Sequence, residues 1–149
     1  MWVERLHDSQ WIETMKEKEI KELKDEKKRE WIGHYGYQTE IDEMSFPKNE
    51  EALEKDHSFL MNHSCHPTVL VYNRQVWIAS RDIKEEEEIS YDYATSEIIF
   101  DRLPSCLCGA PNCRGKVTKD DWKLTSVREA YGDFFQPHLL GLLWKEQNN

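Results

Sequence analysis

The chain contains the stretch Cys106-Leu107-Cys108-Gly109-Ala110-Pro111-Asn112-Cys113, and this stretch decides the fold because it gathers three thiols in one short loop. The remaining cysteine of the 149 residues, Cys65, lies 41 positions before Cys106. Thiolates are the ligands that zinc prefers in closed, tetrahedral structural sites. Four thiols therefore predict one structural zinc ion held by Cys65, Cys106, Cys108 and Cys113, with residues 109–111 forming the turn that folds Cys113 back.

Two disulfides are the alternative use of four cysteines. Residues 62–64 read Asn-His-Ser, a glycosylation sequon typical of secreted proteins. However, no apolar signal segment follows the N-terminus, and the cysteine spacing favours no disulfide framework. We expect zinc, and hence a contact between Cys65 and the C-terminal tail.

The composition limits the partners. The chain carries 20 Lys+Arg against 29 Asp+Glu, a net charge of −9, which opposes sequence-independent binding to a phosphate backbone. Its 38% hydrophobic content, rich in aromatics, can support one modest core, and no apolar run approaches the roughly 18 residues of a membrane span. We expect a soluble, intracellular protein of the nucleus or cytoplasm, with no membrane or direct nucleic-acid binding and with Lys/Arg-rich proteins or peptides as partners.

The negative charge is concentrated in two segments. Residues 40–60 have a balance of −5 and residues 80–101 a balance of −6, so the rest of the chain sums to +2. An ordinary solvated face and a role in steering a basic partner both explain this pattern. The sequence leaves these two explanations open.

Local patterns predict several elements. Helical spacing of apolar residues predicts a charged helix over residues 10–29, followed by a strand over 37–42 and a loop over 44–55. Two β-rich runs, 69–72 and 75–79, are separated by Asn73-Arg74 and predict a hairpin. A further strand is expected at 89–93, and short helices at 125–130 and 137–144.

Three motifs in order carry a family resemblance: Asn62-His63-Ser64-Cys65, Glu88-Ile89-Ser90-Tyr91-Asp92-Tyr93, and Cys106 to Gly115. Together they resemble the C-terminal half of a SET-domain protein lysine methyltransferase with its post-SET zinc segment. The resemblance covers about residues 35–115. It implies an α+β, β-rich fold of short curved strands with a knot-like crossing and a zinc-stapled tail.

The resemblance also implies an activity and roles for single residues. The activity is methylation of lysine in a protein, such as a histone tail, with S-adenosylmethionine as cofactor. Tyr93 would be the catalytic tyrosine, and Tyr91 would line the lysine channel where Phe or Tyr influences how many methyl groups are added. The residues implied to bind the cofactor are Asn62 and His63, with Tyr37 as a weaker candidate and Leu107 as a residue that packs on the adenine.

The chain also departs from the family pattern. Family members begin with a Gly-rich segment, but no Gly-x-Gly occurs in this chain, so we expect the N-terminal SET half to be missing and cofactor binding to be weak. Glu86 stands in a turn where the family usually has Gly, and a left-handed conformation would strain it. We expect a charged helix over residues 1–34, a partial SET domain over 35–101, and a post-SET zinc segment with C-terminal helices over 102–149.

Two other functions compete with catalysis. A catalytically inactive SET-derived module would keep the peptide groove and the zinc tail, because its Gly-rich half is absent. A purely structural zinc domain would keep the metal site alone. In either case Tyr91 and Tyr93 would be strand residues that pack a core.

Overall fold

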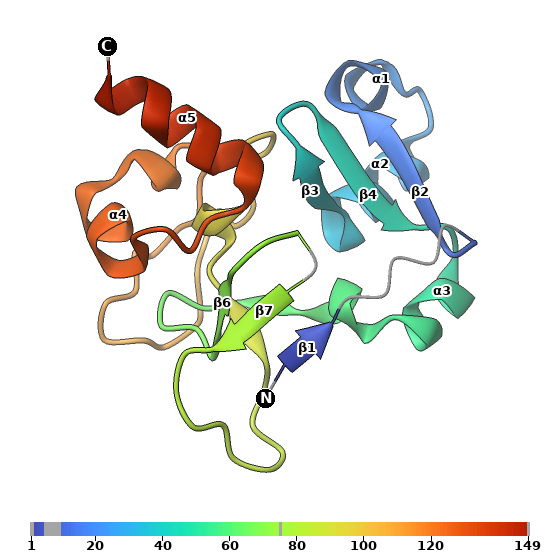
Figure 1. The fold of residues 1–149 in the computed structure, drawn as a ribbon. Helices are drawn as coiled ribbons and strands as arrows, with labels where there is room; N and C mark the ends of the chain where they lie inside the picture. The colour runs from blue at the N-terminus through green and yellow to red at the C-terminus, as the bar shows by residue number, and fades with distance from the viewer. Residues whose placement is uncertain (1, 5–9, 75, 149) are drawn as a thin grey trace.

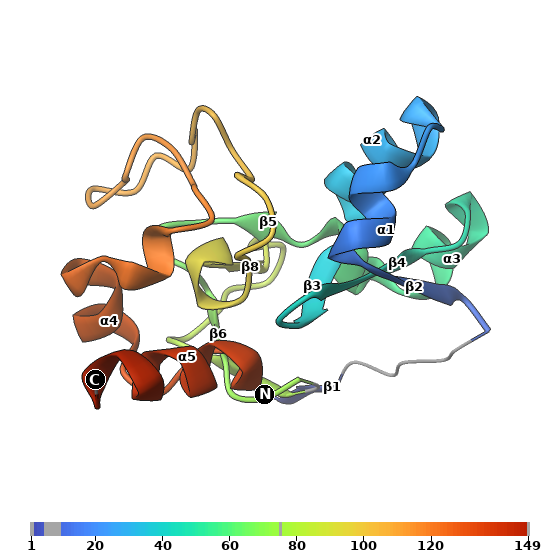
Figure 2. The ribbon, with the colours of Figure 1, turned by 90° about the horizontal axis from the view of Figure 1, so that it is seen from above.

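The computed structural model describes residues 2–4, 10–74 and 76–148. It has two lobes that face each other, as Figures 1 and 2 show from two directions. One lobe is built on the sheet β2-β4-β3, and the other on the sheet β1-β7-β6 together with the parallel pair β5-β8. This small mixed α+β architecture of short strands confirms the expected fold class, whereas the knot-like crossing stays a prediction.

The first lobe packs helices on a small antiparallel sheet. Strand β4 (Glu43–Pro47) lies between β2 (Ile12–Lys16) and β3 (Tyr37–Glu40), so that β3 is an edge strand. The helices are α1 (Glu17–Glu22), α2 (Glu26–Tyr35) and α3 (Glu50–Lys55), followed by the 3-10 helix η1 (His57–Leu60). The core of this lobe consists of the buried side chains Ile20, Ile32, Met44 and Phe46, with Ile99 from the second half of the chain.

Two expectations for this lobe are wrong. The single helix expected over residues 10–29 is instead a strand and parts of two helices, because residues 12–16 pair with β4 and Asp25 caps a new helix by accepting from the Lys28 N–H. The loop expected over 44–55 is instead β4 and α3. Met44 and Phe46 are both buried, and Asn49 caps α3 through the Ala52 N–H. Pairing between distant segments outweighs local propensity here.

The second lobe confirms most local predictions. Strand β7 (Val76–Ala79) pairs antiparallel with β6 (Val69–Val71) and with β1 (Trp2–Glu4), and the Asn73 side chain accepts from the Val76 N–H in the predicted turn. Gln75 lies outside the described residues. The C-terminal helices are α4 (Thr125–Tyr131) and α5 (Pro137–Gln147), after the 3-10 helix η3 (Asp121–Lys123).

The motif strands meet in the second lobe, where β5 (Asn62–His63) runs parallel to β8 (Ser90–Tyr91). The strand expected over 89–93 is shorter, since Tyr93 already begins the 3-10 helix η2 (Tyr93–Thr95). No helix in the described part of the chain is long and apolar enough to cross a bilayer. The domain boundaries at residues 34/35 and 101/102 stay a prediction.

Hydrogen bonds join the two lobes. The Gln38 side chain on β3 is 1% exposed and its Oε1 accepts from the Ile98 and Ile99 N–H groups at 2.7 and 3.2 Å. Arg102 donates to the carbonyls of Gly33 and Gly36 at 3.3 and 2.8 Å. The segment after β8 is therefore held between the lobes, and it carries the candidate site.

Candidate active site and metal centre

The tyrosine pair Tyr91 and Tyr93 lies at the end of the parallel strands. The two ring centroids are 4.8 Å apart, and the ring of Trp77 packs edge-on against Tyr91 at 4.6 Å. Tyr91 is buried, which raises the pKa of its hydroxyl well above the ordinary value, and this hydroxyl donates to Glu97 Oε1 at 3.4 Å. Burial also raises the pKa of Tyr93, so both phenols are protonated donors at neutral pH.

Tyr93 opens onto a cavity of about 350 Å³, which we call the Asn62 cavity. Asn62, Met61, Arg102 and Leu103 also line it, and the Tyr93 hydroxyl donates to the Met61 carbonyl at 3.1 Å. The Arg102 guanidinium lies over the Tyr93 ring at 5.2 Å from its centroid. Two residues predicted from separate motifs, Asn62 and Tyr93, thus share one cavity of a size that can hold a small ligand.

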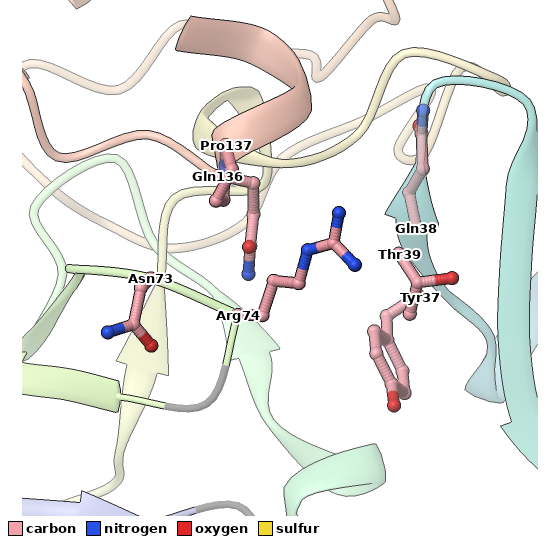
Figure 3. A pocket seen from close by; sticks show the side chains of 7 residues that line it. All are labelled: Tyr37, Gln38, Thr39, Asn73, Arg74, Gln136 and Pro137. Atoms are coloured by element: carbon pink, nitrogen blue, oxygen red, sulfur yellow. The ribbon is translucent and has the colours of Figure 1, made fainter.

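A second cavity, of about 560 Å³, lies between the lobes, and we call it the Arg74 cavity (Figure 3). It is lined by β3 on one side and by the β6–β7 turn and the start of α5 on the other. Figure 3 shows the Arg74 side chain projecting between Gln136 and β3. Arg74 also forms an ion pair with Glu40.

Gln38 belongs to the lining of the Arg74 cavity, and its backbone N–H donates to Glu97 Oε1 at 3.2 Å. Glu97 therefore connects this lining to Tyr91.

The other residues predicted for cofactor binding lie elsewhere. Tyr37 lines the Arg74 cavity, apart from Asn62. Leu107 is 90% exposed and lines neither cavity. The His63 side chain is fully buried, its Nδ1 accepts from the Tyr93 N–H at 3.2 Å, and its Nε2 lies 3.2 Å from Cys65 Sγ. Burial lowers the pKa of His63, so this side chain is a neutral link between the cysteines and Tyr93.

The four cysteines come together as predicted. The sulfur atoms of Cys65, Cys106, Cys108 and Cys113 all lie within 4.8 Å of one another. Tetrahedral Zn–S bonds of about 2.3 Å place sulfurs about 3.8 Å apart, so a small contraction would complete a metal shell. Burial raises the pKa of Cys65 to about 12. A divalent cation at this site would lower the pKa again, because its charge stabilises the thiolate. The donor set and its spacing can hold a metal.

Arg114 ties this cluster to the tyrosines. Its backbone N–H points at Cys65 Sγ at 3.5 Å, and its guanidinium binds both carboxylate oxygens of Asp92 at 2.6 and 2.7 Å. The Asp92 side chain is fully buried, and it also accepts from the Tyr131 hydroxyl at 2.9 Å. In the sequence, Asp92 stands between Tyr91 and Tyr93. A paired, buried charge of this kind fixes the backbone that carries both tyrosines.

The sequence interpretation missed Glu97 and Arg102. Both follow the tyrosine motif within a segment where no local pattern indicates burial, and both are brought to the site by β3 and α2 of the other lobe. Burial opposes the charge of Arg102, but Glu97, Tyr91 and Tyr93 together outweigh this effect and raise the pKa of Arg102. The only sequence signal for the burial of Glu97 is its position directly before the apolar run Ile98-Ile99-Phe100.

The fold and site define a small α+β domain with a four-thiol cluster that can hold a metal and a cavity lined in part by tyrosine. A sequence profile described as "SET domain" matches residues 4–94, more than half of the chain. The chain therefore belongs to the SET domain family. The match includes the segment before Tyr35, which the three sequence motifs do not reach.

Relatives support the same family. The chain is 44% identical over 63 residues to "Histone-lysine N-methyltransferase, H3 lysine-4 specific" of Yarrowia lipolytica, covering 37% of this chain and 5% of the relative. It is 43% identical over 86 residues to "Histone-lysine N-methyltransferase TRX1" of Oryza sativa subsp. japonica, covering 52% and 8%. It is 40% identical over 62 residues to "Probable histone-lysine N-methyltransferase set-23" of Caenorhabditis briggsae, covering 36% and 26%. The chain thus spans only a small part of each relative's length.

Proposed function

We propose that this domain methylates a lysine side chain of a protein with S-adenosylmethionine as methyl donor. The observation that carries the proposal is that Asn62 and Tyr93, from two separate motifs, line one cavity. Membership of the SET domain family and the printed names of the relatives support lysine methylation as the reaction.

When bound, the cofactor would supply a sulfonium methyl group for transfer to the lone pair of the lysine nitrogen. The protein must align the two reactants and exclude water. Asn62 would hold the cofactor in the cavity, and Tyr93 would orient the amine and the methyl group without offering a competing nucleophile. The apolar contact of Tyr91 with Trp77 and Tyr93 lowers the lysine pKa by desolvation.

The substrate class follows from charge and from the relatives. A net charge of −9 favours a Lys/Arg-rich segment, and relatives are named for histone H3 lysine 4, so we propose a histone-like basic peptide. Asp92 and Glu97 of the acidic segment 80–101 are buried, so the exposed acids of that segment are mainly those of the run 85–88. A nuclear or cytoplasmic location remains a prediction.

Zinc is the metal we propose for the four-cysteine centre, because four thiolates form the closed shell typical of structural zinc. Cys65 comes from the loop after β5 and the other three from the tail, so the ion would staple the tail beside the tyrosine pair.

Methyl transfer from labelled cofactor to a basic peptide tests the function. Because the chain has no Gly-x-Gly, we still expect weak cofactor affinity, and the assay uses saturating cofactor. Tyr93→Phe should lower the rate about 100-fold, because the lost hydroxyl acts mainly as the methyl moves. Tyr72→Phe, at an exposed tyrosine, is the matched control and should keep the parent rate. Peptide binding without any transfer by the parent protein would instead indicate an inactive binding module.

A further inference from the structure

The Arg74 cavity contains an ion pair whose two members come from different lobes. Arg74 stands in the turn between β6 and β7, and its partner Glu40 is the last residue of β3. The two side chains are 53% and 36% exposed. Among residues 2–4, 10–74 and 76–148, neither has a second ion-pair partner. Because exposed ion pairs of this kind contribute little stability, the Arg74 guanidinium can leave Glu40 at low cost.

Gln136 brings an amide group to the same cavity. This residue directly precedes α5 and is 5% exposed, and its backbone N–H donates to the Thr95 carbonyl at 2.8 Å. Its side-chain amide, however, makes no hydrogen bond with any residue that the structure describes. Figure 3 shows this amide pointing into the cavity beside Arg74. Since polar groups of buried residues are normally paired, the amide indicates a position for a ligand atom.

The other charges near the cavity are already balanced. Burial lowers the pKa of His138 on α5, so this side chain is neutral beside Glu40 and Arg74. The buried carboxylate of Glu97 faces Arg102, whose positive charge compensates for it. The cavity therefore keeps its charge balance only while a cation lies at Glu40. A ligand that takes the place of Arg74 must itself be a cation.

A guanidinium group from a binding partner has the required chemistry. Its planar fork offers two N–H donors to a carboxylate and leaves other N–H groups for an amide oxygen. The exchange of one guanidinium for another at Glu40 is nearly neutral in free energy. An added hydrogen bond to Gln136 then favours the incoming group. The space of about 560 Å³ beside Arg74 can admit a second side chain during this exchange.

We propose that the Arg74 cavity binds an arginine side chain of the protein substrate, which displaces Arg74 from Glu40 and donates to Gln136. This proposal rests on the proposed function and narrows its substrate class to segments with an arginine near the target lysine. The hydrogen bond from the Gln38 N–H to Glu97 connects the cavity lining to the tyrosine pair, so one bound segment supplies both basic residues. In the free protein, Arg74 acts as an internal substitute for the substrate arginine.

The affinity of peptides for the parent protein, measured by calorimetry, tests this subsite. The peptides contain one lysine and one arginine, and the arginine is moved through the positions on both sides of the lysine. At one position the arginine peptide should bind about tenfold more tightly than the same peptide with citrulline. Citrulline has the shape of arginine without its charge, so it cannot replace Arg74 at Glu40. Equal affinities at every position would overturn the proposal.

Variants of the ion pair should act in opposite directions. Glu40→Gln removes the carboxylate that binds the guanidinium, so the preference for arginine should fall to about twofold or less. Arg74→Gln removes the internal competitor and should raise the affinity for the arginine peptide about threefold. Glu54→Gln and Lys55→Gln, at exposed residues of α3 outside the cavity, are the matched controls. They make the same changes in net charge and should keep the parent preference, whereas equal effects in the controls would contradict the subsite.

The outcomes separate the subsite from the reaction. A preference for arginine without any methyl transfer by the parent protein would disprove the proposed function and keep the subsite. Methyl transfer that does not distinguish arginine from citrulline would keep the reaction and overturn the subsite. Tighter binding of a peptide with glutamate in place of the arginine would also overturn it, because Arg74 itself would then bind the ligand. Arg74→Gln, at an exposed turn, keeps the test decisive even if Glu40→Gln fails to fold.

Discussion

Glu86 is the residue at which the backbone is most clearly strained. Its φ is 63°, and it is the only non-glycine with positive φ among the described residues. A Cβ in the left-handed region lies close to the following carbonyl oxygen, which costs about 1–2 kcal/mol. The side chain is exposed, so no packing compensates for this cost. The strain expected from the sequence is present.

Glu86→Gly should therefore stabilise the fold. Relief of strain outweighs the extra entropy of an unfolded glycine, so the free energy of unfolding should rise by about 0.5–1 kcal/mol in urea denaturation. Glu85→Gly is the matched control, because Glu85 is exposed and lacks positive φ, and it should lower stability by a similar amount. Two losses of equal size would contradict the strain argument.

At the scale of elements, the sequence predicts those whose signals are local. The hairpin at Asn73-Arg74 and the helices α4 and α5 form as expected because turn chemistry and apolar spacing act within a few residues. The helix expected over 10–29 fails because β4 supplies a strand partner 31 positions away, for example Thr14 opposite Ser45. A single sequence does not show which distant segment will pair.

In the candidate site, too, the sequence predicts the residues that have a local signal and misses those that are buried by distant contacts. The four cysteines were predictable because thiols have few structural roles other than metal binding or disulfides, and they do cluster. Glu97 and Arg102 were not, because their burial results from contacts with β3 and α2. The contact of Leu107 with the adenine stays a prediction, since this side chain is almost fully exposed here.

The tail loop from Cys106 to Cys113 should depend on metal for its order. Cys65→Ser, or a chelator, should remove about one zinc per chain by elemental analysis and speed proteolysis within residues 102–117, because the four cysteines themselves make up half of the apolar cluster that holds the loop. Ser105→Ala, at an exposed residue of the same loop, should change neither measurement. Intact disulfides and no zinc in the parent protein would contradict the metal centre.

At the scale of the whole molecule, function depends on how the two lobes are held together. Each lobe has its own core clusters, and the helices of one lobe are remote from those of the other in both views (Figures 1 and 2). A polar link adds to the burial of Ile99 in the first core: Gln38 donates to the Glu40 and Ile41 carbonyls and accepts from the Ile98 and Ile99 N–H groups. One buried amide thus completes the turn after β3 and fixes the segment that follows Glu97.

Gln38→Met, which keeps the length and most of the volume of the side chain, should break this link. The Ile98 and Ile99 N–H groups lose their acceptor, and because unpaired buried donors are expensive, the free energy of unfolding should fall by about 2–4 kcal/mol. Thr39→Val is the matched control, since the Thr39 hydroxyl bonds only within the first lobe, to Glu43 and Ser45, and the loss should stay near 1 kcal/mol or less. Hydrogen exchange shows where in the molecule the link is lost, because the amides of Ile98 and Ile99 should lose protection in Gln38→Met and keep it in Thr39→Val. Equal protection in both variants would mean that apolar contacts, such as those of Ile99 with the core of the first lobe, hold the lobes together instead.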